Sequence, residues 1–336
     1  MNIFQSLSDN ILINVIYIFY SILIIKYAII LSQKLKIIDY PNEKRKIHKK
    51  ATPLVGFFYF LFSFFLFLIF NLIEENFSTR LIFSIGFGLL LNGLIGLIDD
   101  KSSISPNSRL ISIIFIFLIS ISLSEKFVIN DVKSIFFQNI IILNSPFNII
   151  FTTLCYLLLI NSLNLSDGIN GLAISISIIW LIFISFYSET FILKMNLFLI
   201  MSLLILLFFN IKSKLFLGSG GVNFLATYIC FVTVYTYNNS ENLNYEFIFL
   251  FFMIPGIDMI RVFILRILKG KNPFYSDQNH LHHYLIKSFN SKQALSIYCS
   301  LLLIPVLIFL NFNNLILHMI ILKIVTYFYL IKKFSN

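Results

Sequence analysis

Long apolar runs separated by short polar links are the sequence feature that most limits what this chain can fold into. Many of the runs approach the ~17–25 residues that a helix needs to cross a hydrocarbon core of about 30 Å. Hydrophobic residues make up 58% of the 336 and charged residues only 12%, whereas a soluble domain carries about 25% charged residues. Because backbone groups in lipid must bond within their own segment, we expect an all-α polytopic membrane protein with about eleven transmembrane helices.

The expected helices follow one another along the whole chain. Their ranges, to within a few residues at each end, are 11–31, 54–73, 81–98, 110–124, 147–162, 172–188, 195–211, 219–237, 246–265, 295–311 and 315–331. No internal repeat or soluble domain is visible, so residues 1–336 are interpreted as a single transmembrane domain. Cys155, Cys230 and Cys299 show no CxxC or CxxH spacing, which argues against a disulfide framework or a zinc site.

The distribution of basic residues predicts the orientation, because cytoplasmic links are enriched in Lys and Arg. The odd-numbered links and the C-terminal tail hold 18 of the 25 basic residues, whereas the even-numbered links hold only Arg80, Lys126, Lys133 and Lys194. We therefore expect a multi-pass protein of the inner (plasma) membrane with its N-terminus outside and its C-terminus inside. Anchoring of this kind also explains the net charge of +10, so no nucleic-acid partner is expected.

The expected cytoplasmic loops cover about 32–53, 99–109, 163–171, 212–219 and 266–294. The unusual polar groups lie almost entirely in these loops or at their edges, so an active site facing the cytoplasm is expected.

Three short polar segments in these loops suggest ligand binding. Asp99 and Asp100 follow an apolar run directly, and two adjacent carboxylates there favour a cation such as Mg²⁺; an ordinary solvated helix end is the alternative. Residues 161–173 carry an Asn or Asp at every third position, on one side of a helix end; a polar inter-helix turn is the alternative. Residues 216–221 open a helix with a glycine-rich turn whose N–H groups suit a phosphate, although a plain turn explains it equally well.

The ninth link is the richest in chemistry. Asp258 lies inside an apolar run, where an ionisable group is a functional-site candidate by default. Asp277 is expected to cap a short helix that carries His280, His282 and His283. On such a helix His280 and His283 would share a face while His282 pointed elsewhere. The histidines are therefore interpreted as donors to a phosphate or nucleotide, and not as a metal site.

In order along the chain, the motifs are D-x-P, RKxH, P-x-x-G, DD, NxxNxxDGxxGLA, F-x-G and DxxRVxxxRxxxGxxPFxxDxxHxHH, spanning Asp39 to His283. This series resembles the polyprenyl-phosphate N-acetylhexosamine-1-phosphate transferases, the WecA-like branch of the superfamily that includes MraY, which is of the glycosyltransferase family 4 type. The resemblance implies an enzyme that moves a sugar-1-phosphate, as an N-acetylhexosamine-1-phosphate, from a UDP-sugar to undecaprenyl or another polyprenyl phosphate. UMP is released, and the product begins a cell-surface glycan such as an O-antigen of lipopolysaccharide or a cell-wall polymer.

The resemblance also implies roles for individual residues. Asp99 and Asp100 would be catalytic, acting on the lipid phosphate near Mg²⁺ (or Mn²⁺), and Asn164 would bind the metal. The residues expected to bind substrates are Lys46, His48, Arg109, Asp167, Asn170, Arg266, His280, His282 and His283. Where the family usually has a metal-binding aspartate after F-x-G, this chain has Ser219, whose neutral hydroxyl is a much poorer Mg²⁺ ligand.

Two functions remain open at this point. The first is an active transferase. The second is a non-catalytic relative that binds lipid phosphate or a partner glycan enzyme, which Ser219 favours and the retained aspartates and histidines oppose. A transporter would need ionisable groups near the membrane midplane, which the parity of the links does not provide. Several UDP-sugars are compatible with the sequence, and so is a homodimer.

Overall fold

The computed structural model describes residues 11–41, 50–71, 79–136, 140–273, 277–311 and 315–335. One helix overlaps each expected span. These helices are α2 (Ile11–Lys34), α3 (Gly56–Asn71), α4 (Thr79–Ser102), α5 (Pro106–Leu123), α6 (Phe147–Ser166), α7 (Leu172–Ser185), α8 (Thr190–Ile211), α9 (Gly218–Asn239), α10 (Tyr245–Leu268), α12 (Ser291–Asn311) and α13 (Ile316–Phe334). The short helix α11 (Leu281–Ser288) lies in the ninth link.

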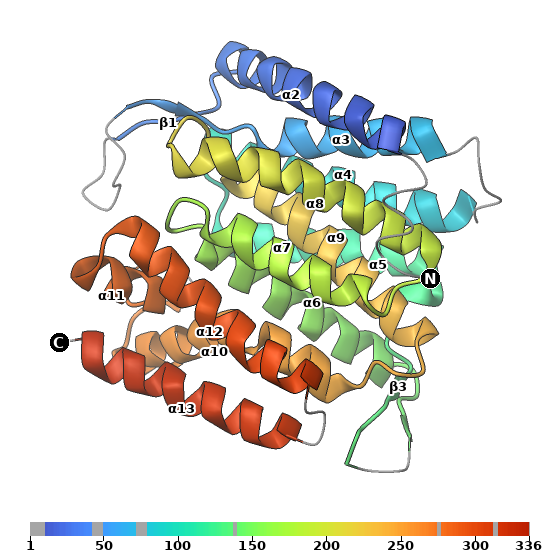
Figure 1. Cartoon of the computed structure of the whole chain (residues 1–336), viewed down its shortest axis with the longest axis vertical. Helices are drawn as coiled ribbons and strands as arrows, with labels where there is room; N and C mark the ends of the chain where they lie inside the picture. The colour runs from blue at the N-terminus through green and yellow to red at the C-terminus, as the bar shows by residue number, and fades with distance from the viewer. Residues whose placement is uncertain are drawn as a thin grey trace.

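The helices run side by side in one bundle (Figure 1), which confirms an all-α polytopic membrane protein. Seven of the described helices are long and apolar enough to cross a membrane, and α3 and α7 are shorter apolar helices. The count of eleven crossings and the orientation stay predictions. The strands are two-residue pieces: β1 (Ile38–Asp39) pairs antiparallel with β2 (Thr52–Pro53), and β3 (Asp131–Val132) with β4 (Ile141–Ile142).

Helix α9 is the central helix of the bundle, and every residue from Gly220 to Tyr237 is buried. Its contacts with α4 are the most extensive between any two described elements. Its polar side chains find partners in neighbouring helices: Thr227 bonds to the Tyr156 hydroxyl at 2.9 Å, and the Tyr228 hydroxyl donates to Asn196 at 2.9 Å. Because protein surrounds it, α9 can be much less apolar than a helix that faces lipid.

Glycines allow α9 to approach its neighbours closely. A Cβ added at Gly96 of α4 would fall on the Ser219 carbonyl, and one added at Gly56 of α3 would lie 2.5 Å from the Leu217 carbonyl. The chain just before α9 is also hydrogen-bonded to the residue before α3, since the Val55 N–H donates to the Phe216 carbonyl at 2.9 Å. The N-terminus of α9 is therefore held directly against the last turn of α4.

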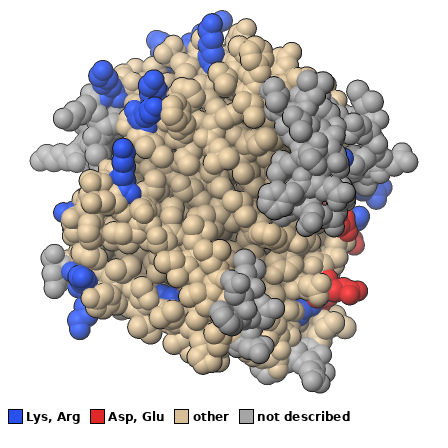
Figure 2. All heavy atoms as spheres, in the orientation of Figure 1, with Lys and Arg blue, Asp and Glu red and all other residues tan. Residues whose placement is uncertain are grey.

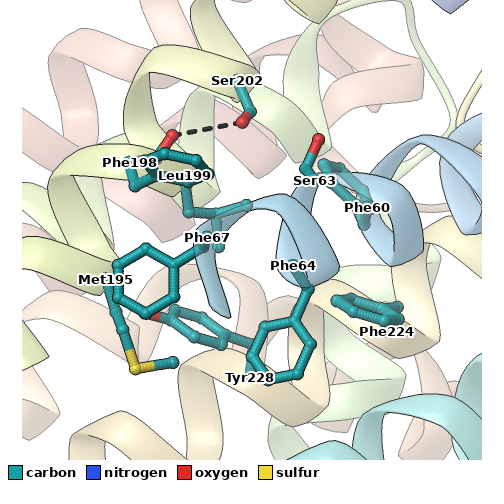
Figure 3. A pocket seen from close by; sticks show the side chains of 10 residues that line it. All are labelled: Phe60, Ser63, Phe64, Phe67, Met195, Phe198, Leu199, Ser202, Phe224 and Tyr228. Atoms are coloured by element: carbon teal, nitrogen blue, oxygen red, sulfur yellow. Dashed lines mark hydrogen bonds between the residues drawn. The ribbon is translucent and has the colours of Figure 1, made fainter. Parts of the chain in front are cut away.

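A small aromatic-lined cavity lies between α3, α8 and α9, where Phe64 and Phe67 face Phe198 and Tyr228 (Figure 3). Its volume is about 20 Å³, which is enough for about one water molecule. The cavity is therefore too small to be a substrate site.

Helices α7 and α13 are hydrogen-bonded to α10 in the turn before Pro255. Pro255 has no N–H to offer the Phe251 carbonyl, and the Trp180 indole N–H donates to that carbonyl instead, at 3.1 Å. The buried ammonium group of Lys323 in α13 donates to the neighbouring Leu250 carbonyl at 2.7 Å. The Lys323 hydrogen bond holds α13 beside α10, where α13 contributes to the site described below.

The charged surface agrees with a membrane-spanning bundle. In Figure 2 a broad uncharged face separates basic side chains, most of them towards the left edge, from acidic side chains at the right edge. The left edge corresponds to the end of the bundle that holds β1 and the C-terminus (Figure 1).

Candidate functional site

Asp100 lies in the last turn of α4 and reaches across to cap α9. Its carboxylate accepts the N–H groups of Ser219 at 2.8 Å and Gly220 at 3.0 Å, and the Ser219 hydroxyl also bonds to it. Helix α9 has no side-chain cap of its own, so Asp100 satisfies backbone donors that would otherwise be free. Because Asp100 already occupies these N–H groups, the glycine-rich turn does not offer them to a phosphate.

Asp99, the neighbouring carboxylate, turns towards α5. It forms an ion pair with Arg109 at 3.2 Å and accepts the Ile104 N–H at 2.9 Å. Ser105 caps α5 by accepting the Ser108 N–H, which starts the helix so that Arg109 lies in its first turns. The structure therefore brings the expected catalytic residue Asp99 and the expected substrate-binding residue Arg109 into contact.

Asn164 and Asp167 lie at the C-terminal end of α6, where Asp167 is the C-cap residue. Removal from water, together with the nearby charges of Asp100 and Asp39, raises the pKa of Asp167 to about 8. The charges of Asp100 and Asp39 therefore act on Asp167 from two other segments of the chain.

These carboxyl groups provide the test of the expected metal site. No three His, Cys, Asp or Glu side chains in the described ranges are grouped closely enough to be recognised as a metal site. However, a buried carboxyl group whose pKa is raised by neighbouring carboxylates fits a divalent cation, which would compensate that charge. The Asn164 amide oxygen, one helical turn before Asp167, is a suitable additional ligand. Ser219 is engaged with Asp100 instead.

Asn170 is placed to one side of this cluster. Its amide donates to the Ser213 hydroxyl at 2.7 Å, and the next residue, Gly171, donates its N–H to Asn210. Gly171 has φ +84° and precedes α7, so its left-handed conformation turns the chain from α6 into α7. Asn170 therefore connects the link between α6 and α7 to the link between α8 and α9 through a hydrogen bond.

The three histidines form one cluster beside Asp167. His280 precedes α11 in an extended conformation, with φ −77° and ψ 153°. The ring centroids of His282 and His283 are 4.1 Å apart, and the rings of His280 and His282 are nearly parallel at 5.7 Å. A Cβ added at Gly168, the residue after Asp167, would overlap the His282 ring. His282 therefore faces the end of α6.

The predicted helical phase of the histidines is wrong, because His280 precedes α11 and only His282 and His283 lie within it. The expected cap was also wrong: the Leu281 N–H at the start of α11 is bound by Asp258 at 3.2 Å. Asp277 instead accepts the Asn279 N–H at 3.0 Å.

Asp258 organises the histidine cluster from α10. Its carboxylate accepts hydrogen bonds from Arg261 at 2.8 Å and from the Tyr327 hydroxyl of α13 at 2.6 Å, and it contacts Nδ1 of His280 at 3.0 Å. With Nδ1 engaged, Nε2 of His280 points away from Asp258, and it has no partner among the described residues. The same holds for Nε2 of His282. Both imidazoles thus have a buried polar atom without an internal partner, which is uncommon in a folded protein.

The surroundings of the histidines next to α6 favour their neutral form. Burial, reinforced by the neighbouring imidazoles, lowers the pKa of His282 well below its usual value and that of His283 to about 4. Each neutral ring has one donor and one acceptor nitrogen, so the cluster suits hydrogen bonding to a polar ligand.

Arg266 lies on the wall of a pocket of about 410 Å³ beyond the histidines, together with Lys269 and Lys271. Its guanidinium binds Asp277 at 2.8 Å and the Pro273 carbonyl at 2.6 Å, and its third nitrogen is buried without a partner in the described part of the chain. Burial alone would raise the pKa of Asp277, but the Arg266 hydrogen bond holds it below its usual value. The pocket is basic and suits an anion.

Most of the expected site residues therefore lie along one end of the bundle, in the order Arg109, Asp99, Asp100, Asp167, His282. Lys46 and His48 lie outside the described residues. Sequence reasoning gave no role to Asp39 or Tyr327. Asp39 can be recognised in the sequence as the first residue of the D-x-P motif. Tyr327 cannot, because it is one of 16 tyrosines and belongs to no motif.

Comparison with known proteins gives a consistent result. Residues 82–237 match the family model of Glycosyl transferase family 4. A phospho-N-acetylmuramoyl-pentapeptide-transferase of Dictyoglomus thermophilum is 30% identical over 291 residues, which cover 82% of this chain and 89% of that protein. An undecaprenyl-phosphate alpha-N-acetylglucosaminyl 1-phosphate transferase of Thermotoga maritima is 26% identical over 277 residues, covering 81% and 80%. A probable undecaprenyl-phosphate N-acetylglucosaminyl 1-phosphate transferase of Bacillus subtilis is 27% identical over 265 residues, covering 75% and 70%.

Proposed function

Since this chain belongs to glycosyl transferase family 4, we propose that it transfers a sugar-1-phosphate from a UDP-sugar to a polyprenyl phosphate and releases UMP. The observation that carries this proposal lies at one end of the bundle, where the charge of Asp100 helps to raise the pKa of Asp167 and His282 packs against Gly168, the next residue. The comparisons do not favour the non-catalytic alternative. Ser219, which prompted that alternative, has a role of its own as a partner of Asp100.

The residues divide into two groups that suit the two substrates. Arg109, paired with Asp99 at the end of α4, can bind the phosphate group of the lipid. An oxygen of that phosphate attacks the β-phosphorus of the UDP-sugar, and UMP leaves. The histidines and Arg266 would bind the UDP-sugar, because their imidazole and guanidinium nitrogens include atoms without an internal hydrogen-bond partner. Such a reaction depends mainly on alignment and charge compensation.

Asn164, Asp167 and Asp100 are the residues that would hold Mg²⁺. When bound, the ion would neutralise charge on the phosphate oxygens. Asp100 also fixes the N-terminus of α9 through its two backbone hydrogen bonds, so its position does not depend on the ligand.

The site is proposed to face the cytoplasm in the plasma membrane. The links at this end of the bundle carry most of the basic residues, as expected for cytoplasmic links. An N-acetylhexosamine is the proposed sugar, because two of the relatives are named for N-acetylglucosamine.

The test is UMP release by the purified protein from a panel of UDP-sugars, with undecaprenyl phosphate and Mg²⁺. The panel includes UDP-N-acetylglucosamine, UDP-N-acetylgalactosamine and UDP-N-acetylmuramoyl-pentapeptide. Release that requires both the lipid and one donor supports the proposal, and Asp99→Asn serves as the matched control. Failure to release UMP from any donor, in protein that is folded, would favour the non-catalytic relative.

A further inference from the structure

A short β-hairpin leaves the bundle at the end opposite Asp100, between α5 and α6. Asp131 pairs with Ile142 and Val132 with Ile141. Five large apolar side chains of the described hairpin residues lie exposed, with exposed fractions between 40% and 73%. They are Ile135, Phe136, Ile140, Ile141 and Ile142. Such a concentration of apolar surface on one small element indicates an interaction surface.

The polar groups of the hairpin are bound on its other side. The Lys133 N–H donates to the Tyr237 hydroxyl at 2.6 Å, and the Lys133 ammonium donates to the Tyr237 carbonyl at 3.1 Å. The Ile135 N–H donates to the Glu246 carboxylate at 3.2 Å. These bonds fasten the hairpin to α9 and α10, so the apolar side chains cannot turn inward. Lys133 and Asp131 are the charged residues of the described hairpin, and Asp131 has a buried carboxylate oxygen.

The exposed apolar residues of the hairpin are followed along the chain by an exposed apolar stripe on α6. Phe147, Ile150, Leu154 and Leu158 recur at helical spacing and have exposed fractions between 43% and 57%. On a membrane-spanning helix such a stripe faces hydrocarbon. Figure 1 shows the hairpin projecting sideways from the ends of the helices, across the direction in which they run. It therefore extends along the membrane and not straight out into water.

From this continuity we propose that the outward face of the hairpin lies in the lipid interface, at the membrane face opposite the Asp100 site. Its occupant is the boundary between lipid headgroups and acyl chains, where amphipathic elements bury their apolar side. The hairpin fixes the depth and tilt of α5 and α6 from the side opposite the substrates. This inference does not depend on the proposed enzymatic activity.

Thiol accessibility in nanodiscs of phosphatidylethanolamine and phosphatidylglycerol tests the proposal. Ile142→Cys is compared with Glu125→Cys, a matched control at an exposed acidic residue of the same end, using a charged maleimide. Maleimide reacts with the thiolate, and apolar surroundings raise a thiol's pKa, so each unit of that rise slows labelling about tenfold. The native protein gives the background from Cys155, Cys230 and Cys299, and both variants should label equally in SDS.

A second readout separates lipid from a protein partner. Ile142→Trp should be quenched by lipids brominated on the acyl chains, whereas Glu125→Trp should not; the native Trp180 is fully buried. We expect Ile142→Cys to label at least about tenfold more slowly than the control, together with quenching of Ile142→Trp. Equal labelling rates would place the face in water and overturn the proposal. Slow labelling without quenching would also overturn it, because a second copy or another protein would then cover the face.

Discussion

Replacing Ser219 with aspartate tests the contact between α4 and α9 on which the site depends. Ser219 donates its N–H to Asp100 at 2.8 Å, and its hydroxyl bonds to the same carboxylate. In Ser219→Asp a second carboxylate would face the first. The Ser219 carbonyl lies against Gly96 so closely that a Cβ there would overlap it. The backbone therefore has little room to move the two charges apart.

The expected loss of stability follows from these contacts. A hydrogen bond to a charged group contributes about 1.5–3 kcal/mol, and two like charges about 4 Å apart repel by about 4 kcal/mol at an effective dielectric of 20. Allowing for relaxation, we expect the free energy of unfolding of the cation-free protein to fall by roughly 2–5 kcal/mol. At about 2 °C per kcal/mol the Tm falls by at least about 4 °C.

Thermal unfolding in EDTA and in millimolar Mg²⁺ provides the assay, with Ser219→Asn as the neutral control of similar size. Mg²⁺ should raise the Tm of Ser219→Asp more than that of the control, because the ion offsets the repulsion. If Ser219→Asp in EDTA were as stable as the native protein, the described contact would be wrong. If Mg²⁺ shifted both variants equally, the assignment of a cation to this place would fail.

Three further predictions address other parts of the site. Gly96→Ala should lower the Tm by several degrees, because its Cβ would overlap the backbone of α9, whereas Gly86→Ala on the same helix has 3.7 Å to its nearest neighbour and should leave the Tm unchanged. Tyr327→Phe removes a hydrogen bond to Asp258 and should raise KM for the UDP-sugar about five- to tenfold with little change in kcat; an unchanged KM would show that the histidines are held without it. Asp99→Asn should cut turnover about a hundredfold or more with a small change in Tm, and a near-native rate would remove Asp99 from the reaction.

The helices could be predicted because lipid imposes a simple rule on every segment. An apolar run long enough to cross must be helical, so each expected range overlaps an observed helix. The ends were less accurate. Helix α4 continues to Ser102 and α6 to Ser166, which places Asp100 and Asn164 inside helices and not in loops. Polar residues in the last turn do not end a helix that packing supports.

The arrangement of the histidines could not be predicted, because it depends on contacts between residues distant in sequence. Asp258 binds His280 and the Leu281 N–H across more than 20 positions, and this fixes where α11 begins. A shift of one residue in that start is enough to change which histidines share a helix face. Local patterns such as H-x-H-H reveal the chemistry of the side chains but not the backbone conformation that presents them.

Two carboxylates at this end of the bundle act as caps for helices other than their own. Asp100 of α4 binds the first N–H groups of α9, and Asp258 of α10 binds the first N–H of α11. Each carboxylate thereby couples the position of a ligand-facing loop to the packing of two helices, so substitutions at either will reduce stability and substrate binding together. His282 is different, because its Nε2 makes no hydrogen bond within the described chain and its replacement therefore removes no internal hydrogen bond of that atom. A loss of UDP-sugar binding in His282→Asn at unchanged Tm is therefore the clearest way to separate recognition of the substrate from the architecture that supports it.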